Sequence, residues 1–175
     1  MHPHSRKEKD SLGEREIPSN VYWGIQTLRA QENFPVSGIK ARPALIRAYV
    51  LIKKACALAN RDGGVLTKEQ ADAITQACSE VLEGKLQDQF IVDVYQAGAG
   101  TSFNMNVNEV IAYRAHVISG GFGETGPGGA ALEVVLRDAA QQGALLTRLQ
   151  PRLEHYQYLK NGLARFCALA LDTTL

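Results

Sequence analysis

The sequence predicts a mainly α-helical protein, and three observations support this fold class. Apolar residues recur at steps of three and four over several long segments, which is the spacing of a helix with one buried face. Glycine-rich turns at Gly63–Gly64 and at residues 120–129 separate these segments. Only one short run, residues 87–95, is rich in β-prone residues. We therefore expect an extended N-terminal arm, a helical hairpin, a Gly-rich loop that enters a helix, and a second helical hairpin.

The N-terminal arm is expected from composition. The first ten residues are strongly charged, which is typical of a frayed end, and residues 12–38 are broken repeatedly by Gly and Pro. From Pro43 the run "PALIRAYVLIKKACALAN" has apolar residues at helical spacing, which predicts a helix with one buried face. The residues of this face would be Leu45, Ala48, Tyr49, Ile52, Ala55, Cys56 and Ala59. Proline is favoured in the first turn of a helix, so we expect the helix to begin at Pro43.

A second helix is expected after the Gly63–Gly64 turn. Thr67 with Gln70 three residues later forms a capping-box pattern ahead of "KEQADAITQACSEVLEG", and Gly84 is a natural stop. The two helices would form a hairpin. Residues 87–95 are interpreted as an extended connection or a brief strand.

The stretch "QAGAGTSFNMNVNE", residues 96–109, combines small residues with hydroxyl and amide side chains and contains one charge. Helical spacing begins at about Phe103 and continues to Gly120, so the Gly-rich segment leads into a helix. Such a helix N-terminus favours an anion, and a hydroxyl of Thr101 or Ser102 could donate to a carboxylate. Alternatively, Thr101 or Ser102 is simply the N-cap, with the Asn residues solvated or bonded to neighbouring backbone.

Composition breaks suggest three parts: residues 1–119, a Gly-rich linker at 120–129, and a helical tail at 130–175. The tail contains two helical patterns that predict a second hairpin. Its core-facing stripe would consist of Tyr156, Leu159, Leu163, Phe166 and Leu169.

Composition and motifs argue against several classes of function. The chain has 175 residues, 45% hydrophobic and 21% charged, with a net charge of +1, which argues against a dedicated nucleic-acid or anionic-membrane surface. No apolar run approaches the length of a membrane span and the start has no apolar signal core, so we expect no membrane partner and a cytoplasmic protein. The stretch at residues 96–109 matches neither of two common phosphate-binding motifs. A P-loop needs Lys at the position of Gly100, and the dinucleotide-binding fingerprint needs a third Gly at the position of Phe103.

Metal and disulfide chemistry are not expected either. Cys56, Cys78 and Cys167 lie in apolar helical patterns without a CxxC pair, so reduced, buried thiols are expected. His116 has no second histidine or carboxylate at metal-ligand spacing and is interpreted as a packed or surface residue.

Two blocks of sequence carry a resemblance to a known family. "LGEREIPSNVYWGIQTLRAQENFPVSG" followed by "DVYQAGAGTSFNMNVNEVIAYRA" resembles the N-terminal part of the aspartase/fumarase superfamily, in the same order and spacing. The likeness runs from about Asp10 to Ala115. Within the superfamily, "LGEREIP", "TLRAQENF" and "QAGAGTS" look like aspartate ammonia-lyase rather than class II fumarase, although substrates of the fumarase and argininosuccinate-lyase type stay open.

The resemblance implies the reversible elimination of ammonia from L-aspartate to give fumarate, without metal or organic cofactor. It assigns to Thr101 a contact with the substrate carboxylate. Ser102, Asn104 and Asn106 match motif positions that line or support the site. Glu109 would be structural rather than a general base. The implied partners are a small dicarboxylate or amino acid, L-aspartate or fumarate, and further copies of the chain.

Departures from the family limit what this chain is expected to do. Family members are more than twice as long, and the mobile "GSSxMPxKxN" loop that supplies their serine base has no counterpart in this sequence; the tail from Ala130 does not resemble them. Tyr113 stands where Asn is usual, which could weaken packing or a hydrogen bond. We expect a catalytically incomplete lyase fragment that self-associates. The alternatives are a non-catalytic helical interaction module derived from a lyase and a fumarase-like hydratase fragment.

Overall fold

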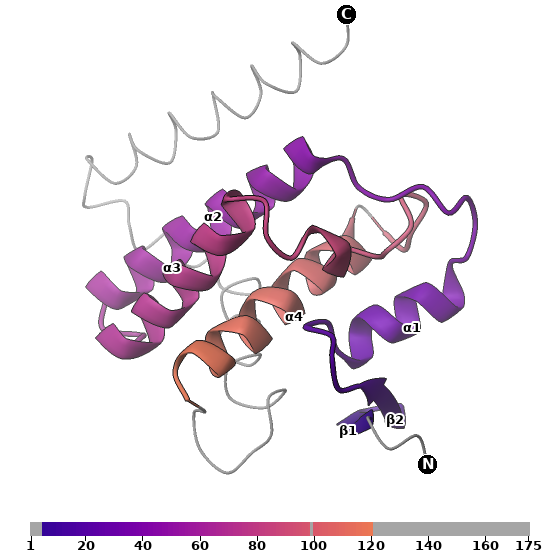
Figure 1. The fold of residues 1–175 in the computed structure, drawn as a ribbon, viewed down its shortest axis with the longest axis horizontal. Helices are drawn as coiled ribbons and strands as arrows, with labels where there is room; N and C mark the ends of the chain where they lie inside the picture. Colours follow the sequence, from indigo (N-terminus) through magenta and orange to yellow (C-terminus); the bar gives the residue numbers. More distant parts are fainter. Residues whose placement is uncertain (1–4, 99, 121–175) are drawn as a thin grey trace, which may run out of the picture. The chain divides into compact units, whose positions relative to one another are not determined.

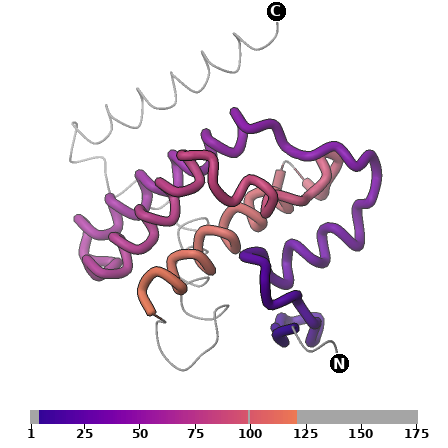
Figure 2. Tube along the Cα trace, viewed as in Figure 1, coloured from indigo at the N-terminus to yellow at the C-terminus, as the bar shows by residue number. Residues whose placement is uncertain are grey.

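The computed structural model describes residues 5–98 and 100–120, and these residues form the expected mainly α-helical fold. In chain order the elements are β1 (Ser5–Asp10), β2 (Gly13–Pro18), α1 (Ile25–Asn33), α2 (Pro43–Asp62), α3 (Lys68–Leu82), the 3-10 turn η1 (Gln87–Gln89) and α4 (Thr101–Ile118) (Figure 1). Figure 2 traces the chain through them. No helix in this described part is both long and apolar enough to cross a membrane. The expected linker beyond Gly120, the helical tail and Cys167 lie outside the described residues.

Residues 5–33 do not form the frayed and extended arm expected from the sequence. β1 and β2 pair as an antiparallel hairpin, from Ser5 opposite Pro18 to Asp10 opposite Gly13, and α1 follows the hairpin. The strands escape prediction because nearly all their residues are charged or polar, so they lack the alternation of apolar residues that marks a half-buried strand. Of the two strands only Ile17 contributes a buried side chain.

Polar contacts attach the hairpin to the helices. The guanidinium of Arg29 in α1 binds both carboxylate oxygens of Asp10, with N–O distances of 2.7 Å. Arg6 donates to three backbone carbonyls between residues 18 and 23, and its guanidinium lies 4.3 Å from the ring centroid of Tyr113 in α4. Tyr113, which stands where the resembled family usually has Asn, therefore makes a cation–π contact with Arg6.

α2 and α3 form the helical hairpin that the sequence predicts. Pro43 is the first residue of α2. The capping box of α3 is present: Gln70 N donates to Thr67 Oγ1 at 3.2 Å, and Thr67 N donates to Gln70 Oε1 at 3.0 Å. Gly84, with a φ of 91°, follows the end of α3, as expected of a stop residue.

The buried apolar residues of the two helices are Ile46, Val50, Cys56, Ala57, Ala71, Ala73, Ile74, Ala77, Cys78 and Val81. The predicted buried face of α2 is wrong except at Cys56, since Leu45 and Ile52 are exposed. α2 is apolar around much of its circumference, so spacing alone does not show which face is packed against the core.

The two cysteines of this hairpin are buried free thiols, as expected. Burial raises the pKa of the Cys78 thiol to about 12, because the charged thiolate would lose its hydration in the apolar interior. Cys78 is therefore protonated and unreactive in the folded protein at neutral pH.

The connection from α3 to α4 contains η1 and a single bridge between Lys40 and Asp93, rather than a strand. The Asp93 carboxylate accepts hydrogen bonds from Ser37 N, Ser37 Oγ, Gly38 N and Tyr95 N, at 2.7 to 2.8 Å. Through these four bonds Asp93 ties the segment before α2 to the segment before α4.

α4 is the most buried helix of the described part and packs against α1, α2 and α3 (Figure 1). It begins at Thr101, two residues before the predicted start, and ends just before Gly120, which has a φ of 74°. Arg114 of α4 binds both carboxylate oxygens of Glu80 in α3, at 2.6 and 2.9 Å. Its buried apolar residues are Phe103, Val107, Val110, Ile111, Ala112 and Ala115.

Candidate functional site

The described residues that lead into α4, 96–98 and 100–102, are called here the α4 entrance. Gly98 and Gly100 have φ angles of 60° and 93°, a region that residues with a side chain rarely adopt. A Cβ atom on Gly98 would also lie 3.1 Å from Thr101 Oγ1. Glycine at both positions thus allows the chain to turn into the helix and lets the side chains of Thr101 and Tyr49 lie close to its backbone.

Gln96 fixes the α4 entrance to the helix. Its Oε1 accepts a hydrogen bond from Phe103 N, and its Nε2 donates to Asp93 O at 3.2 Å. Gln96 therefore supplies the acceptor that a capping side chain normally provides, although it lies several residues before the helix. Its role escaped prediction because capping is usually read from the residue immediately before the helix.

Neither Thr101 nor Ser102 is the N-cap, which corrects one of the two readings of the sequence. The N-cap is Gly100, and Thr101 and Ser102 are the first two residues of α4. Thr101 is exposed and Ser102 is 8% exposed. Within the part of the chain that the structure describes, their hydroxyl groups and backbone N–H groups have no hydrogen-bond partner. Four donors at one helix N-terminus are thus available to a ligand.

The three Asn residues of α4 have different environments. Asn104 is half-buried. Asn106 is fully buried; its Nδ2 donates to Gln89 O and its Oδ1 accepts from Ile91 N, both at 3.0 Å. This amide holds the segment around η1 against α4. Asn108 is also fully buried, and neither of its amide atoms has a partner among the residues described.

Tyr49 of α2 also lies at the α4 entrance. Its ring packs edge-on against Phe103, with centroids 5.0 Å apart and planes at 81°. Its hydroxyl oxygen lies 3.3 Å from the position that a Cβ atom on Gly100 would take. From the sequence, Tyr49 could be placed only on a helix face, because nothing in the local pattern connects it with a loop far along the chain.

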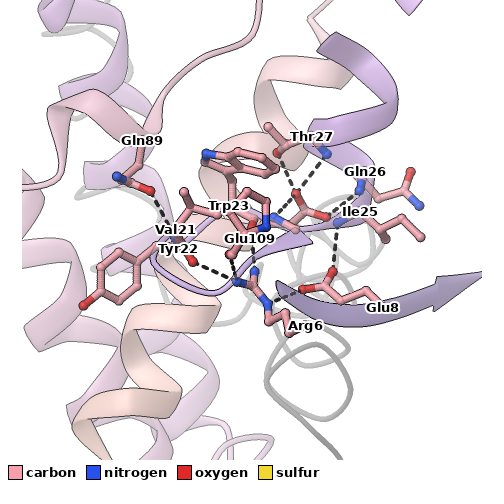
Figure 3. A network of polar contacts seen from close by, with 12 residues as sticks. Arg6, Glu8, Val21, Tyr22, Trp23, Ile25, Gln26, Thr27, Gln89 and Glu109 are labelled. Carbon is pink, nitrogen blue, oxygen red and sulfur yellow. Dashed lines mark hydrogen bonds and ion pairs between the residues drawn. The ribbon is translucent and has the colours of Figure 1, made fainter. Parts of the chain in front are cut away.

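Glu109 of α4 is bound by the N-terminus of α1, and Figure 3 shows this network. Its carboxylate accepts from Gly24 N at 2.9 Å, Gln26 N at 2.8 Å, Thr27 N at 3.0 Å and Thr27 Oγ1 at 2.6 Å. Burial raises the pKa of Glu109, and these donors oppose the shift. All its close partners belong to the fold, so Glu109 has the structural role expected of it.

Glu8 of β1 completes the same cap, because its Oε2 accepts from Ile25 N at 2.8 Å (Figure 3). A Cβ atom on Gly24 would lie 2.7 Å from Glu8 Oε2 and 3.0 Å from Glu109 Oε1. Glycine at this position therefore allows two carboxylates to approach one helix N-terminus. α1 has no capping side chain of its own, and the two carboxylates favour it through its helix dipole.

The α4 entrance is suited to an anion rather than to a metal. Hydroxyl and backbone N–H groups donate hydrogen bonds, and the helix N-terminus carries a partial positive charge. None of these neutral donors is a general base. Over residues 5–98 and 100–120, no group of three or more His, Cys, Asp or Glu side chains could hold a metal ion.

Comparison with known proteins shows that the chain is similar in sequence to aspartate ammonia-lyases and to class II fumarate hydratases. The chain is 54% identical over 120 residues to an aspartate ammonia-lyase of Bacillus sp, covering 69% of this chain and 26% of that protein. It is 56% identical over 115 residues to a class II fumarate hydratase of Halobacterium salinarum, covering 66% of this chain and 24% of that protein. The chain therefore spans about a quarter of the length of these relatives.

Solved structures give the same result. A fumarate lyase:delta crystallin from Brucella melitensis superposes with a TM-score of 0.67 at 47% identity, over 73% of this chain and 31% of that chain. Residues 13–126, more than half of the chain, match the sequence model of a family described as Lyase. The chain belongs to this lyase family, within the aspartase/fumarase superfamily.

Proposed function

We propose that the α4 entrance binds one carboxylate of L-aspartate or fumarate and contributes this contact to the reversible elimination of ammonia from L-aspartate. The observation that carries the proposal is the set of unengaged donors on Thr101 and Ser102 at a glycine-flanked helix N-terminus. The relatives named aspartate ammonia-lyase support this choice of substrate.

The chemistry gives these donors a catalytic use. Removal of the proton next to a carboxylate builds additional negative charge on the carboxylate oxygens. Donors that are already oriented stabilise this charge more than they stabilise the ground state, and this difference lowers the barrier. Thr101 and Ser102 are the proposed donors, Asn104 lies one turn further along α4, and Asn106 holds the surrounding backbone.

We expect little turnover by the isolated chain, because the proposed site contains hydrogen-bond donors but no group that accepts the substrate proton. Hydroxyl, amide and backbone N–H groups cannot accept the substrate proton, and a general base commonly contributes ~10² to 10⁴ in rate. Binding is therefore the property to test first, with turnover measured in parallel.

The test is ligand-dependent thermal unfolding of the purified 175-residue chain. L-aspartate and fumarate should raise the melting temperature, since a ligand at about ten times its Kd adds about 1.4 kcal/mol of stability. Thr101→Ala should remove the shift, whereas Thr75→Ala, which alters a threonine of α3, should retain it. Fumarate formation from L-aspartate is followed by ultraviolet absorbance in the same samples.

The outcomes separate the alternatives. No shift with either ligand would contradict substrate binding and favour a non-catalytic interaction module. Turnover that depends on Thr101 would overturn the expectation of an inert chain.

A fumarase-like hydratase reaction is the second candidate, because relatives of the two activities match at 54% and 56% identity. L-malate distinguishes them, since it carries a hydroxyl where L-aspartate carries the amino group. A larger shift with L-aspartate than with L-malate supports the ammonia-lyase reaction, and the reverse supports the hydratase reaction.

We further propose that the chain associates with copies of itself. Leu45 and Ile52 are each 40% exposed and lie two turns apart on one face of α2. Exposed apolar residues on one helix face favour contact with another protein surface.

A further inference from the structure

We propose that the hydroxyl of Tyr49 is a further substrate-contacting group, which donates a hydrogen bond to the carboxylate held at the α4 entrance. This inference rests on the proposed function and adds a contact from α2, an element that the sequence comparison with the family motif does not single out. The ligand class is a small dicarboxylate such as fumarate or L-aspartate.

The position of the hydroxyl is the first argument. Tyr49 Oη lies 3.3 Å from the site of a Cβ atom on Gly100, the N-cap of α4. The next two residues are Thr101 and Ser102, whose N–H groups are free within the described residues. The phenol therefore lies beside the backbone to which an anion would bind.

The fixed orientation of the ring is the second argument. Phe103 is 2% exposed, and its edge-on contact with Tyr49 holds the phenol ring in one direction. A donor that is oriented before the ligand arrives loses little entropy on binding, which strengthens its contribution to affinity.

The hydroxyl of Tyr49 is also available to a ligand. Tyr49 is half-buried, and its oxygen makes no hydrogen bond within the described part of the chain. A carboxylate bound at the α4 entrance can accept a hydrogen bond from it.

The test is a titration followed by amide NMR, with fumarate and L-aspartate as the probes. Three proteins are compared: the unaltered chain, Tyr49→Phe and Tyr113→Phe. Phenylalanine at position 49 keeps the ring contact with Phe103 and removes only the hydroxyl. Tyr113→Phe is the matched control, since Tyr113 contacts Arg6 through its ring and lies near the far end of α4.

In the unaltered chain we expect the amide signals of Thr101 and Ser102 to shift on titration. Tyr49→Phe should raise the Kd about tenfold or more, because hydrogen bonds to charged groups are stronger than neutral ones. Its melting temperature without ligand should stay that of the unaltered chain, which excludes a folding defect. Tyr113→Phe should bind with unchanged Kd.

Each other result has a definite meaning. If the unaltered chain binds and Tyr49→Phe binds equally well, the role of Tyr49 is overturned while the proposed function stands. If the unaltered chain shows no shifts at Thr101 and Ser102, the proposed function fails and the inference fails with it.

Discussion

Asp93 and Glu109 are two carboxylates with four hydrogen bonds each and with opposite pKa shifts. Asp93 is 8% exposed and Glu109 is 4% exposed. Burial raises the pKa of both, but at Asp93 the donors from Tyr95, Ser37 and Gly38 outweigh burial and hold the pKa at about 2. At Glu109 burial is the larger effect. The two carboxylates thus accept the same number of hydrogen bonds but have opposite pKa shifts. The direction of each shift depends on whether the hydrogen bonds or the loss of hydration has the larger effect on the pKa.

The low pKa of Asp93 predicts how stability depends on pH. The carboxylate is stabilised in the folded state relative to the unfolded state, where its pKa is about 3.9. Its contribution is therefore complete above pH 4 and is lost as the pH falls from about 4 towards 2. Asp93→Asn should lower stability at neutral pH and flatten this part of the profile. Urea unfolding at a series of pH values measures both effects.

Asp88 provides the control for this experiment. It is exposed and lies five residues before Asp93 in the same connection. Asp88→Asn should leave the acid part of the stability profile as steep as in the unaltered chain. An equal flattening by both variants would show that general charge repulsion, rather than the Asp93 cluster, governs the acid response.

At the scale of elements, the success of sequence analysis depends on whether an element is specified locally. α2 and α3 carry their own periodicity, first-turn proline and capping box, and their bounds follow from these signals. The hairpin β1–β2 and the helix α1 carry no such signals. The hairpin is held by Arg6 and Asp10 through contacts with distant residues, and such contacts cannot be read from a local pattern.

The N-terminus of α4 gives a prediction at the element scale. Gln96→Ala should lower the free energy of unfolding by about 1 kcal/mol, the usual cost of losing a capping side chain. Thr101→Ala should change it by less than about 0.5 kcal/mol, as is usual for exposed residues without special contacts. Thr67→Ala removes an established cap in α3 and serves as the reference. Urea unfolding compares the three variants.

A large loss in Thr101→Ala would count against this assignment. It would mean that Thr101 caps α4 in solution, and the hydroxyl would then be less available to a ligand. Near-equal values for Gln96→Ala and Thr67→Ala would support capping by Gln96.

At the scale of the whole molecule, the candidate site could be predicted in part. Thr101 and Ser102 could be proposed from the sequence because hydroxyl residues that follow glycines at a helix N-terminus have a clear physical meaning. Asn106 was expected to line or support the site. In the structure its side-chain amide is hydrogen-bonded to the backbone of Gln89 and Ile91, next to η1. Tyr49 and Gln96 were missed, since their roles depend on how α2 and the preceding loop approach the helix.

The chain is expected to associate with copies of itself through the exposed face of α2. Sedimentation velocity should show a sedimentation coefficient that rises with protein concentration. Leu45→Lys combined with Ile52→Lys places charge on the exposed face of α2 and should keep the chain monomeric. Val65→Lys changes an equally apolar residue, 53% exposed, in the turn between α2 and α3, and should associate like the unaltered chain. A monomer at every concentration would refute the prediction.

The cap of α1 has a consequence for the order of events during synthesis. α1 has nine residues, fewer than the roughly 12 to 15 at which an isolated helix becomes marginally stable in water. One of its two capping carboxylates, Glu109, is 82 to 85 residues further along the chain. On the ribosome, α1 therefore has to wait until Glu109, midway along α4, has been made. The α2–α3 hairpin, whose caps are local, can form while α1 is still unfolded, so the first helix in the sequence is completed after later ones.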